Sequence, residues 1–140
     1  MAKKVLFLCN GNSARSQMAE GILRHRRGND YEAFSAGIKP TSVHPMTIKV
    51  MAEIGIDISS QRSKSIDEFR DLDFDFVITV CDNAKEACPF FPKGARRIHW
   101  SFIDPAEAKG TEDARLIVFR KVRDQIMEMI KEQFEKGLKL

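Results

Sequence analysis

A run of four apolar residues, Val5–Leu8, passes directly into the polar stretch CNGNSARS, Cys9–Ser16, and then into an amphipathic segment. An apolar run this short, ended by Asn-Gly-Asn, is typical of a buried strand. From Ser13 the apolar residues recur at helical spacing as far as Leu23. A strand that turns at once into a helix predicts an α/β fold. It also sets the polar stretch at the carboxyl end of a strand, the edge where open α/β sheets bind ligands.

The alternation of strands and helices continues along the chain. Further strands are predicted at Tyr31–Gly37, Phe74–Val80 and Arg96–Phe102, and helices at His44–Ile56 and from Thr111 to Phe134, with a helical turn at Ser65–Phe69. We expect a three-layer sandwich in which a four-stranded parallel sheet is flanked by helices. With 140 residues and no linker or repeat, the chain is expected to form a single domain over residues 1–140.

The composition excludes several classes of protein. The chain is 43% hydrophobic and 31% charged, as in an ordinary globular protein, and its net charge of +3 is far below the basic footprint of a nucleic-acid-binding protein. No apolar stretch approaches the roughly 18 residues that a membrane helix needs, and the N-terminal apolar run is too short for a signal peptide. We therefore expect a cytoplasmic protein that binds neither nucleic acid nor membranes. The scattered histidines, His25, His44 and His99, lack the spacing of a metal site or a triad, which predicts surface or core roles.

The three cysteines, Cys9, Cys81 and Cys88, match neither a secreted disulfide framework nor a zinc-binding pattern. In a reducing compartment such cysteines are either small buried side chains or chemically active ones. Cys81 follows the predicted strand Phe74–Val80, so it is expected at the same sheet edge as Cys9. Both interpretations remain open for Cys81 and Cys88 on spacing alone.

The stretch Cys9–Ser16 has the residue types of an anion site. Backbone N–H groups in a tight turn before a helix converge on a concave site, and the helix N-terminus favours negative charge there. The predicted oxyanion-binding residues are Gly11, Asn12, Ser13, Ala14, Arg15 and Ser16. Arg15 can hold an oxyanion with a bidentate fork, while the same amides and the Ser16 hydroxyl would keep Cys9 as a thiolate aimed at the central atom. The alternative is a buried structural cysteine beside a helix-surface arginine.

Several motifs carry a resemblance to a known family. They are VLFLCNGNSARSQMAEG at the N-terminus, then FSAGI, IGIDIS, VITVCD, the spaced residues HW.F.DPA, and VRDQI near the C-terminus. Together they resemble the low-molecular-weight tyrosine phosphatase superfamily, and more narrowly the thioredoxin-coupled arsenate reductases that share its fold. The resemblance covers almost the whole chain.

The resemblance implies a reaction as well as a fold. Cys9 would attack arsenate, with Asp104 as the general acid, and Cys81 would then attack Cys9 so that arsenite leaves. Cys88 would attack Cys81, and thioredoxin would reduce the Cys81–Cys88 disulfide. The resemblance further implies a monomer without a tightly bound cofactor, for which phosphate and sulfate are competing anions.

Two departures from the family pattern bear on the reaction. Ala14 stands where many relatives carry a further cysteine, which leaves Cys81 and Cys88 as the relay. Ala106 and Glu107 follow Asp104-Pro105 where the phosphatases have an aromatic pair, which favours a small inorganic oxyanion over phosphotyrosine. The rival functions are a phosphatase that hydrolyses phosphate monoesters through a phosphocysteine, and a non-catalytic oxyanion or redox sensor. The rival interpretation of Asp104 is that Asp-Pro only starts a turn.

Some of the reductases bind potassium beside the loop through residues that match Asn12, Glu20, Ser35 and a carboxylate near position 64. This chain has Lys64 there. The ammonium of Lys64 could replace the ion by pairing with Glu20, or Lys64 could be a solvated side chain in a polar loop.

Overall fold

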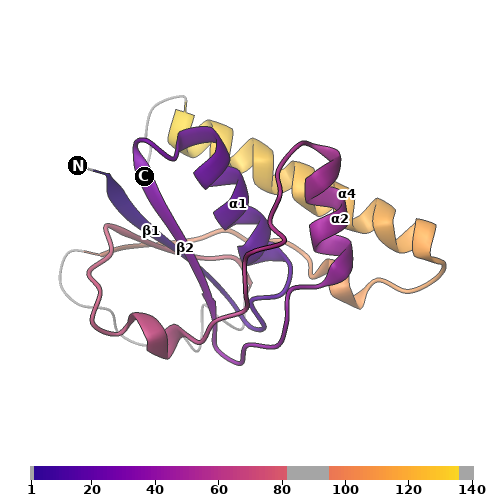
Figure 1. Cartoon of the computed structure of the whole chain (residues 1–140), viewed down its shortest axis with the longest axis horizontal. Coiled ribbons are helices and arrows are strands. Elements are labelled where there is room, and N and C mark those ends of the chain that lie inside the picture. The colour runs from indigo at the N-terminus through magenta and orange to yellow at the C-terminus, as the bar shows by residue number, and fades with distance from the viewer. Residues whose placement is uncertain (1, 82–94, 136–140) are drawn as a thin grey trace.

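The computed structural model describes residues 2–81 and 95–135, and its sheet is the frame on which the rest is built (Figure 1). Its strands are β1 (Lys3–Cys9), β2 (Tyr31–Gly37), β3 (Phe76–Thr79) and β4 (Arg96–His99), all parallel, in the order β2-β1-β3-β4. The expected four-stranded parallel sheet is confirmed. The polar stretch after β1 therefore lies at the carboxyl edge of a central strand, between the ends of β2 and β3.

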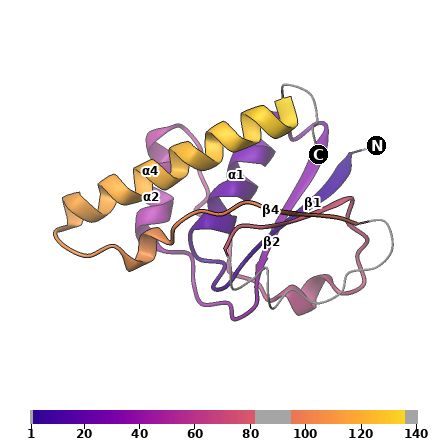
Figure 2. The same ribbon diagram turned by 180° about the vertical axis from the view of Figure 1, so that it is seen from behind.

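The helices cover the sheet unequally. Helices α1 (Arg15–Arg27), α2 (Pro45–Glu53) and α4 (Glu112–Ile130) lie on one side, and the short 3-10 helix η1 (Ile66–Phe69) lies on the other (Figures 1 and 2). The short 3-10 helix η2 (Pro105–Glu107) precedes α4 and a π-helical turn, η3 (Lys131–Glu135), follows it. This is the expected sandwich of a sheet between helical layers. Among the described residues, no helix combines the length and the apolar character needed to cross a membrane.

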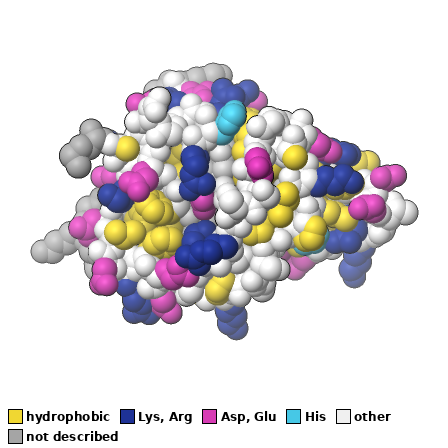
Figure 3. All heavy atoms as spheres, in the orientation of Figure 1, with side chains coloured by type: hydrophobic (Ala, Val, Ile, Leu, Met, Phe, Trp, Pro, Cys, Tyr) yellow, Lys and Arg dark blue, Asp and Glu magenta, His cyan; other side chains and the backbone are white. Residues whose placement is uncertain are grey.

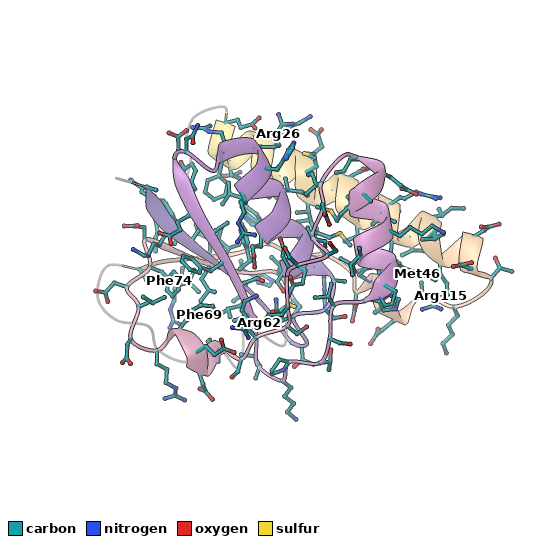
Figure 4. All side chains as sticks on the ribbon, in the orientation of Figure 1. Arg26, Met46, Arg62, Phe69, Phe74 and Arg115 are labelled. Carbon is teal, nitrogen blue, oxygen red and sulfur yellow. The ribbon has the colours of Figure 1, made fainter. Side chains whose placement is uncertain are left out.

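Strand β1 is wholly apolar because both of its faces are covered. All four side chains of Val5–Leu8 are fully buried. On the side of the long helices, Phe7 packs 6.0 Å from Trp100. On the other side, Phe69 and Phe74 pack around Phe34 of β2, with ring centroids 5.6 and 5.4 Å from it (Figure 4). A strand buried on both faces is the usual environment of a continuous apolar run in a parallel sheet.

The ends of the helices follow local signals in the sequence. His44 caps α2, because its Nδ1 accepts a hydrogen bond from the backbone N–H of Met46, and Pro45 follows at the first helical position. Thr111 caps α4 through its hydroxyl and the backbone N–H of Ala114. The predicted helix to Phe134 is α-helical only as far as Ile130 and then widens into η3.

The surface carries charges of both signs. In the view of Figure 3, lysine and arginine side chains lie interspersed with aspartate and glutamate rather than gathered on one patch. This mixed distribution agrees with the small net charge of +3.

Candidate active site

The loop that joins β1 to α1 is a short backbone arch between Cys9, the last residue of β1, and Arg15, the first of α1. Asn12, at its centre, has a φ of +50°, in the left-handed region. Asparagine tolerates this conformation better than most residues. The arch starts directly at the end of the central strand, which fixes its position.

The peptide carbonyls of this loop point away from its centre. Those of Cys9, Asn10, Gly11 and Ser13 accept hydrogen bonds of 2.8–3.2 Å from the backbone N–H groups of Ile38, Lys39, Thr41 and His44, in that order. The carbonyl of Asn12 accepts from Gln17 Nε2 at 3.0 Å and from Ser63 Oγ at 2.6 Å. Because the carbonyls are held outward, the amide N–H groups are left to face the inside of the arch. An arch of inward N–H groups at the start of a helix is a cradle for an anion.

Cys9 is buried, with the residue only 2% exposed, and its sulfur lies inside this cradle. It accepts a hydrogen bond from the Asn12 backbone N–H at 3.1 Å and lies 2.8 Å from the Ser16 hydroxyl. The Lys64 backbone N–H donates to Asn12 Oδ1 at 2.9 Å, so the other end of that amide, Nδ2, donates to Ser16 Oγ at 2.7 Å. The Ser16 hydrogen is thereby free to point at the sulfur. Two donors on one sulfur stabilise a negative charge there.

Arg15 and Asp104 meet at the rim of the cradle. Arg15 Nη2 lies 3.5 Å from Asp104 Oδ2, and Nη1 donates to the carbonyl of Phe102 at 3.1 Å. The other carboxylate oxygen, Oδ1, caps η2 by accepting from the Ala106 backbone N–H at 3.0 Å. Asp104 therefore does start a turn, and it also directs its second oxygen toward Arg15 at the cradle.

Cys81 lies at the same edge of the sheet as Cys9. Leu8 and Thr79 are paired between β1 and β3, and the Val80 N–H donates to the Leu8 carbonyl at 2.8 Å. Cys81 follows Val80, so it lies just beyond the last backbone hydrogen bond between these two segments, at the edge where β1 ends with Cys9. Both cysteines are buried. Cys88 lies outside the described residues.

Lys64 is held beside the cradle by a set of polar contacts. Its Nζ donates to the carbonyl of Arg62 at 2.7 Å and lies 3.5 Å from both Glu20 Oε1 and Ser35 Oγ. The Lys64 side chain is 12% exposed, so it is not a solvated surface group. Burial lowers the pKa of Lys64, and the negative charge of Glu20 opposes that change. Glu20 is itself buried and is paired through its second oxygen with Arg24 at 2.6 Å.

The structure brings Asn12, Glu20, Ser35 and Lys64 into one cluster, in which the ammonium occupies the position beside Glu20. The Lys64 ammonium therefore supplies the positive charge beside Glu20 in this cluster. In the described parts of the chain, no group of three or more histidine, cysteine, aspartate or glutamate side chains could hold a metal ion.

Sequence reasoning missed the residues that hold the loop from outside, above all Gly37. A Cβ on Gly37 would lie 2.8 Å from the Asn10 carbonyl oxygen and 2.9 Å from the Asn12 backbone N. Both contacts are backbone atoms of the cradle, so only a hydrogen fits between β2 and the loop. The glycine in FSAGI was the available signal, but the sequence does not say what approaches it.

Replacing Gly37 with alanine is expected to weaken binding of inorganic phosphate at least about tenfold, because the loop must shift to admit the methyl group. Titration calorimetry measures the dissociation constant. Gly21→Ala is the matched control, since its Cβ would lie 2.7 Å from Cγ2 of the Ile58 side chain and not from the backbone of the cradle. Both variants should lose thermal stability, but only Gly37→Ala should lose affinity. Equal phosphate affinities in the two variants would contradict the role given to Gly37.

Known proteins of similar sequence and structure extend this description. The family of low molecular weight phosphotyrosine protein phosphatases matches residues 4–139. An arsenate reductase of Halalkalibacterium halodurans is 48% identical over 138 residues, or 98% of this chain and 99% of the relative. A solved structure of an arsenate reductase in the phosphate-binding state has a TM-score of 0.78 and 36% identity, covering 96% of this chain and 98% of that one. A thioredoxin-dependent arsenate reductase of Corynebacterium glutamicum has a TM-score of 0.68 and 30% identity, over 94% of this chain and 61% of that one.

The family match includes the whole cradle, from Cys9 to Ser16, as well as Asp104 and the segment around Cys81. The sequence likeness to the Halalkalibacterium halodurans protein runs over nearly the full length of both chains. The chain belongs to the low molecular weight phosphotyrosine protein phosphatase family and, within it, to the arsenate reductases.

Proposed function

We propose that this protein is a cytoplasmic, thioredoxin-dependent arsenate reductase that acts as a monomer, with residues 1–140 forming one domain. The observation that carries the proposal is the Cys9 sulfur with two hydrogen-bond donors, set inside a cradle of backbone N–H groups beside Arg15. The full-length likeness to arsenate reductases supports arsenate as the anion. Phosphate and sulfate, with the same tetrahedral shape, are expected to compete for the cradle.

The first step joins sulfur to arsenic. The loop amides and the Arg15 guanidinium hold arsenate, and the Cys9 thiolate attacks the arsenic atom. An As–S bond forms and an As–O bond breaks, with Asp104 as the acid that gives its proton to the departing oxygen. The position of Asp104 Oδ2 at the rim, 3.5 Å from Arg15 Nη2, supports this role.

The second step reduces arsenic. Cys81 attacks the Cys9 sulfur, the As–S electron pair stays with arsenic, and arsenite leaves as a Cys9–Cys81 disulfide forms. Arsenic gains two electrons and two thiols lose them. Cys88 then attacks Cys81, which frees Cys9 and leaves a Cys81–Cys88 disulfide. The dithiol of thioredoxin reduces that disulfide and supplies the two electrons of the next cycle.

The deciding experiment follows NADPH consumption by the protein with thioredoxin, thioredoxin reductase and arsenate. We expect sustained consumption that depends on both arsenate and thioredoxin. Absence of consumption, together with steady aryl phosphate turnover by a variant lacking Cys81 and Cys88, would replace the proposal with a phosphatase. Oxyanion binding without either reaction would identify a sensor.

The Lys64–Glu20 pair predicts that the reductase does not depend on potassium. At constant ionic strength, exchange of sodium for potassium should change kcat/KM of the wild type by less than about twofold, because an ammonium already lies beside Glu20 at 3.5 Å. Lys64→Met should lower kcat/KM, whereas Lys49→Met, on the exposed side of α2, should not. Clear activation of the wild type by potassium would contradict the prediction that Lys64 takes the place of the ion.

A further inference from the structure

His44 is held rigidly between the active-site loop and two helices. Its backbone N–H donates to the Ser13 carbonyl at 3.1 Å, which makes it one of the residues that turn the loop carbonyls outward. Its ring packs against Phe119 of α4 with centroids 4.9 Å apart. Its Nδ1 accepts from the Met46 backbone N–H at 3.1 Å. The backbone of His44 is therefore fixed by Ser13, and its imidazole ring by Phe119 and Met46.

The contact with Met46 settles which ring nitrogen carries the proton. A nitrogen that accepts a hydrogen bond has a free lone pair, so the proton of a neutral imidazole is on the other nitrogen, Nε2. Burial lowers the pKa of His44, and the charge of Arg115 lowers it further, against the opposing charge of Asp104. His44 is thus a neutral ring that presents an N–H donor at Nε2.

What faces this donor is another donor. Arg115 Nη2 lies 3.5 Å from His44 Nε2, and a guanidinium has no acceptor to offer. Arg115 Nε is buried and has no hydrogen-bond partner among the described residues. Nor does any carboxylate in the described ranges lie within ion-pair distance of Arg115, in contrast to Arg120 and Arg123 on the same helix, which both pair with Glu53.

His44 and Arg115 come together where the beginnings of α2 and α4 meet. In Figure 4, Arg115 lies near the beginning of α4 beside Met46 at the start of α2. The His44 backbone N–H is bonded to the Ser13 carbonyl, so this corner adjoins the cradle. Two of the N–H donors, on His44 Nε2 and Arg115 Nη2, thus lie 3.5 Å apart, and a third, on Arg115 Nε, has no partner among the described residues. An acceptor is the group that would satisfy them.

We propose that His44 and Arg115 form a second binding site for a small tetrahedral oxyanion, next to the cradle of Cys9 but separate from it. Such an anion has several oxygens and can accept from an imidazole N–H and from two N–H groups of a guanidinium at once. Arg115 supplies the positive charge. Asp104, the negative group that faces this corner, makes the site weaker than the cradle, where the loop amides add their donors.

The site is tested by titrating the whole protein with inorganic phosphate at constant ionic strength, followed by NMR. We expect two saturation curves, a tighter one for the loop amides of residues 12–15 and a weaker one for the His44 imidazole. A His44 response that follows the loop curve would overturn the proposal, and so would one that never saturates. The loop curve reports separately on the cradle, so failure of the second site is distinct from failure of the proposed reductase.

Arg115→Met is the decisive variant. Substituting His44 would remove the cap of α2, so its effects would mix folding with binding. In Arg115→Met the affinity read at His44 should fall at least about tenfold, while the loop curve keeps its midpoint. Lys121→Met is the control for charge, because it removes one positive charge from an exposed position of the same helix and should change neither curve. An unchanged His44 curve in Arg115→Met would refute the second site.

Discussion

Replacing Cys9 with serine is expected to lower the rate of arsenate reduction about 10⁴-fold or more, because the sulfur that bonds to arsenic is lost. A serine hydroxyl has almost the same size and can still accept from Asn12 and pair with Ser16. The cradle should therefore persist, and phosphate should bind with an affinity within a few fold of the wild type. Arsenite release measures the rate, and titration calorimetry measures binding.

Loss of arsenite release with phosphate binding retained is the result that would identify Cys9 as the nucleophile. Loss of both activity and phosphate binding would mean that serine disturbs the loop, and circular dichroism together with thermal unfolding would reveal it. Arsenite release at more than one hundredth of the wild-type rate would show that another group is the nucleophile.

Replacing Cys88 with serine is expected to allow one arsenite per protein molecule and then to stop the reaction. Reduction of arsenate takes two electrons, which Cys9 and Cys81 supply by forming a disulfide. That disulfide would connect side chains that are 2% and 4% exposed, so thioredoxin cannot reach it easily. The third thiol is required to carry the oxidation to a place where a protein reductant can act.

Rapid mixing with arsenate, followed by quantification of arsenite and of free thiols, checks this stoichiometry. The Cys88→Ser protein should release one equivalent and retain no reactive thiol at Cys9. Cys81→Ser is the matched control, since it lacks the attacking sulfur and should release none. Undiminished turnover of Cys88→Ser with thioredoxin would disprove the relay.

The elements of this fold were largely predictable because each depends on a local pattern. The strand Tyr31–Gly37 has the predicted bounds. Strand β1 is longer than its apolar core and β3 is shorter than the apolar run Phe74–Val80, because a strand ends where its neighbour stops pairing. The order of the strands is set by long-range packing, which no local pattern records.

The candidate site, like the fold, was predictable only where it depends on a local pattern in the sequence. The cradle from Cys9 to Ser16 was recognisable because strand, turn and helix follow one another in the chain. The contacts that brace it come from Gly37, His44 and Ser63, which are distant in sequence. His44 was expected to have only a surface or core role, and its Nε2 donor became visible only through its hydrogen bond to Met46 and the nearby Arg115. A residue's orientation depends on its three-dimensional partners, which spacing does not reveal.

The outward-held carbonyls of the loop also bear on how the protein distinguishes one oxyanion from another. Because the backbone is already fixed in the free protein, little conformational entropy remains to be lost when an anion enters. A rigid cradle of this kind cannot adjust its shape to bind one tetrahedral anion more tightly than another of nearly equal size. Phosphate and arsenate should therefore bind to the cradle with nearly equal affinities. The distinction arises later in the cycle, because only arsenic can accept the electron pair that the departing sulfur leaves behind.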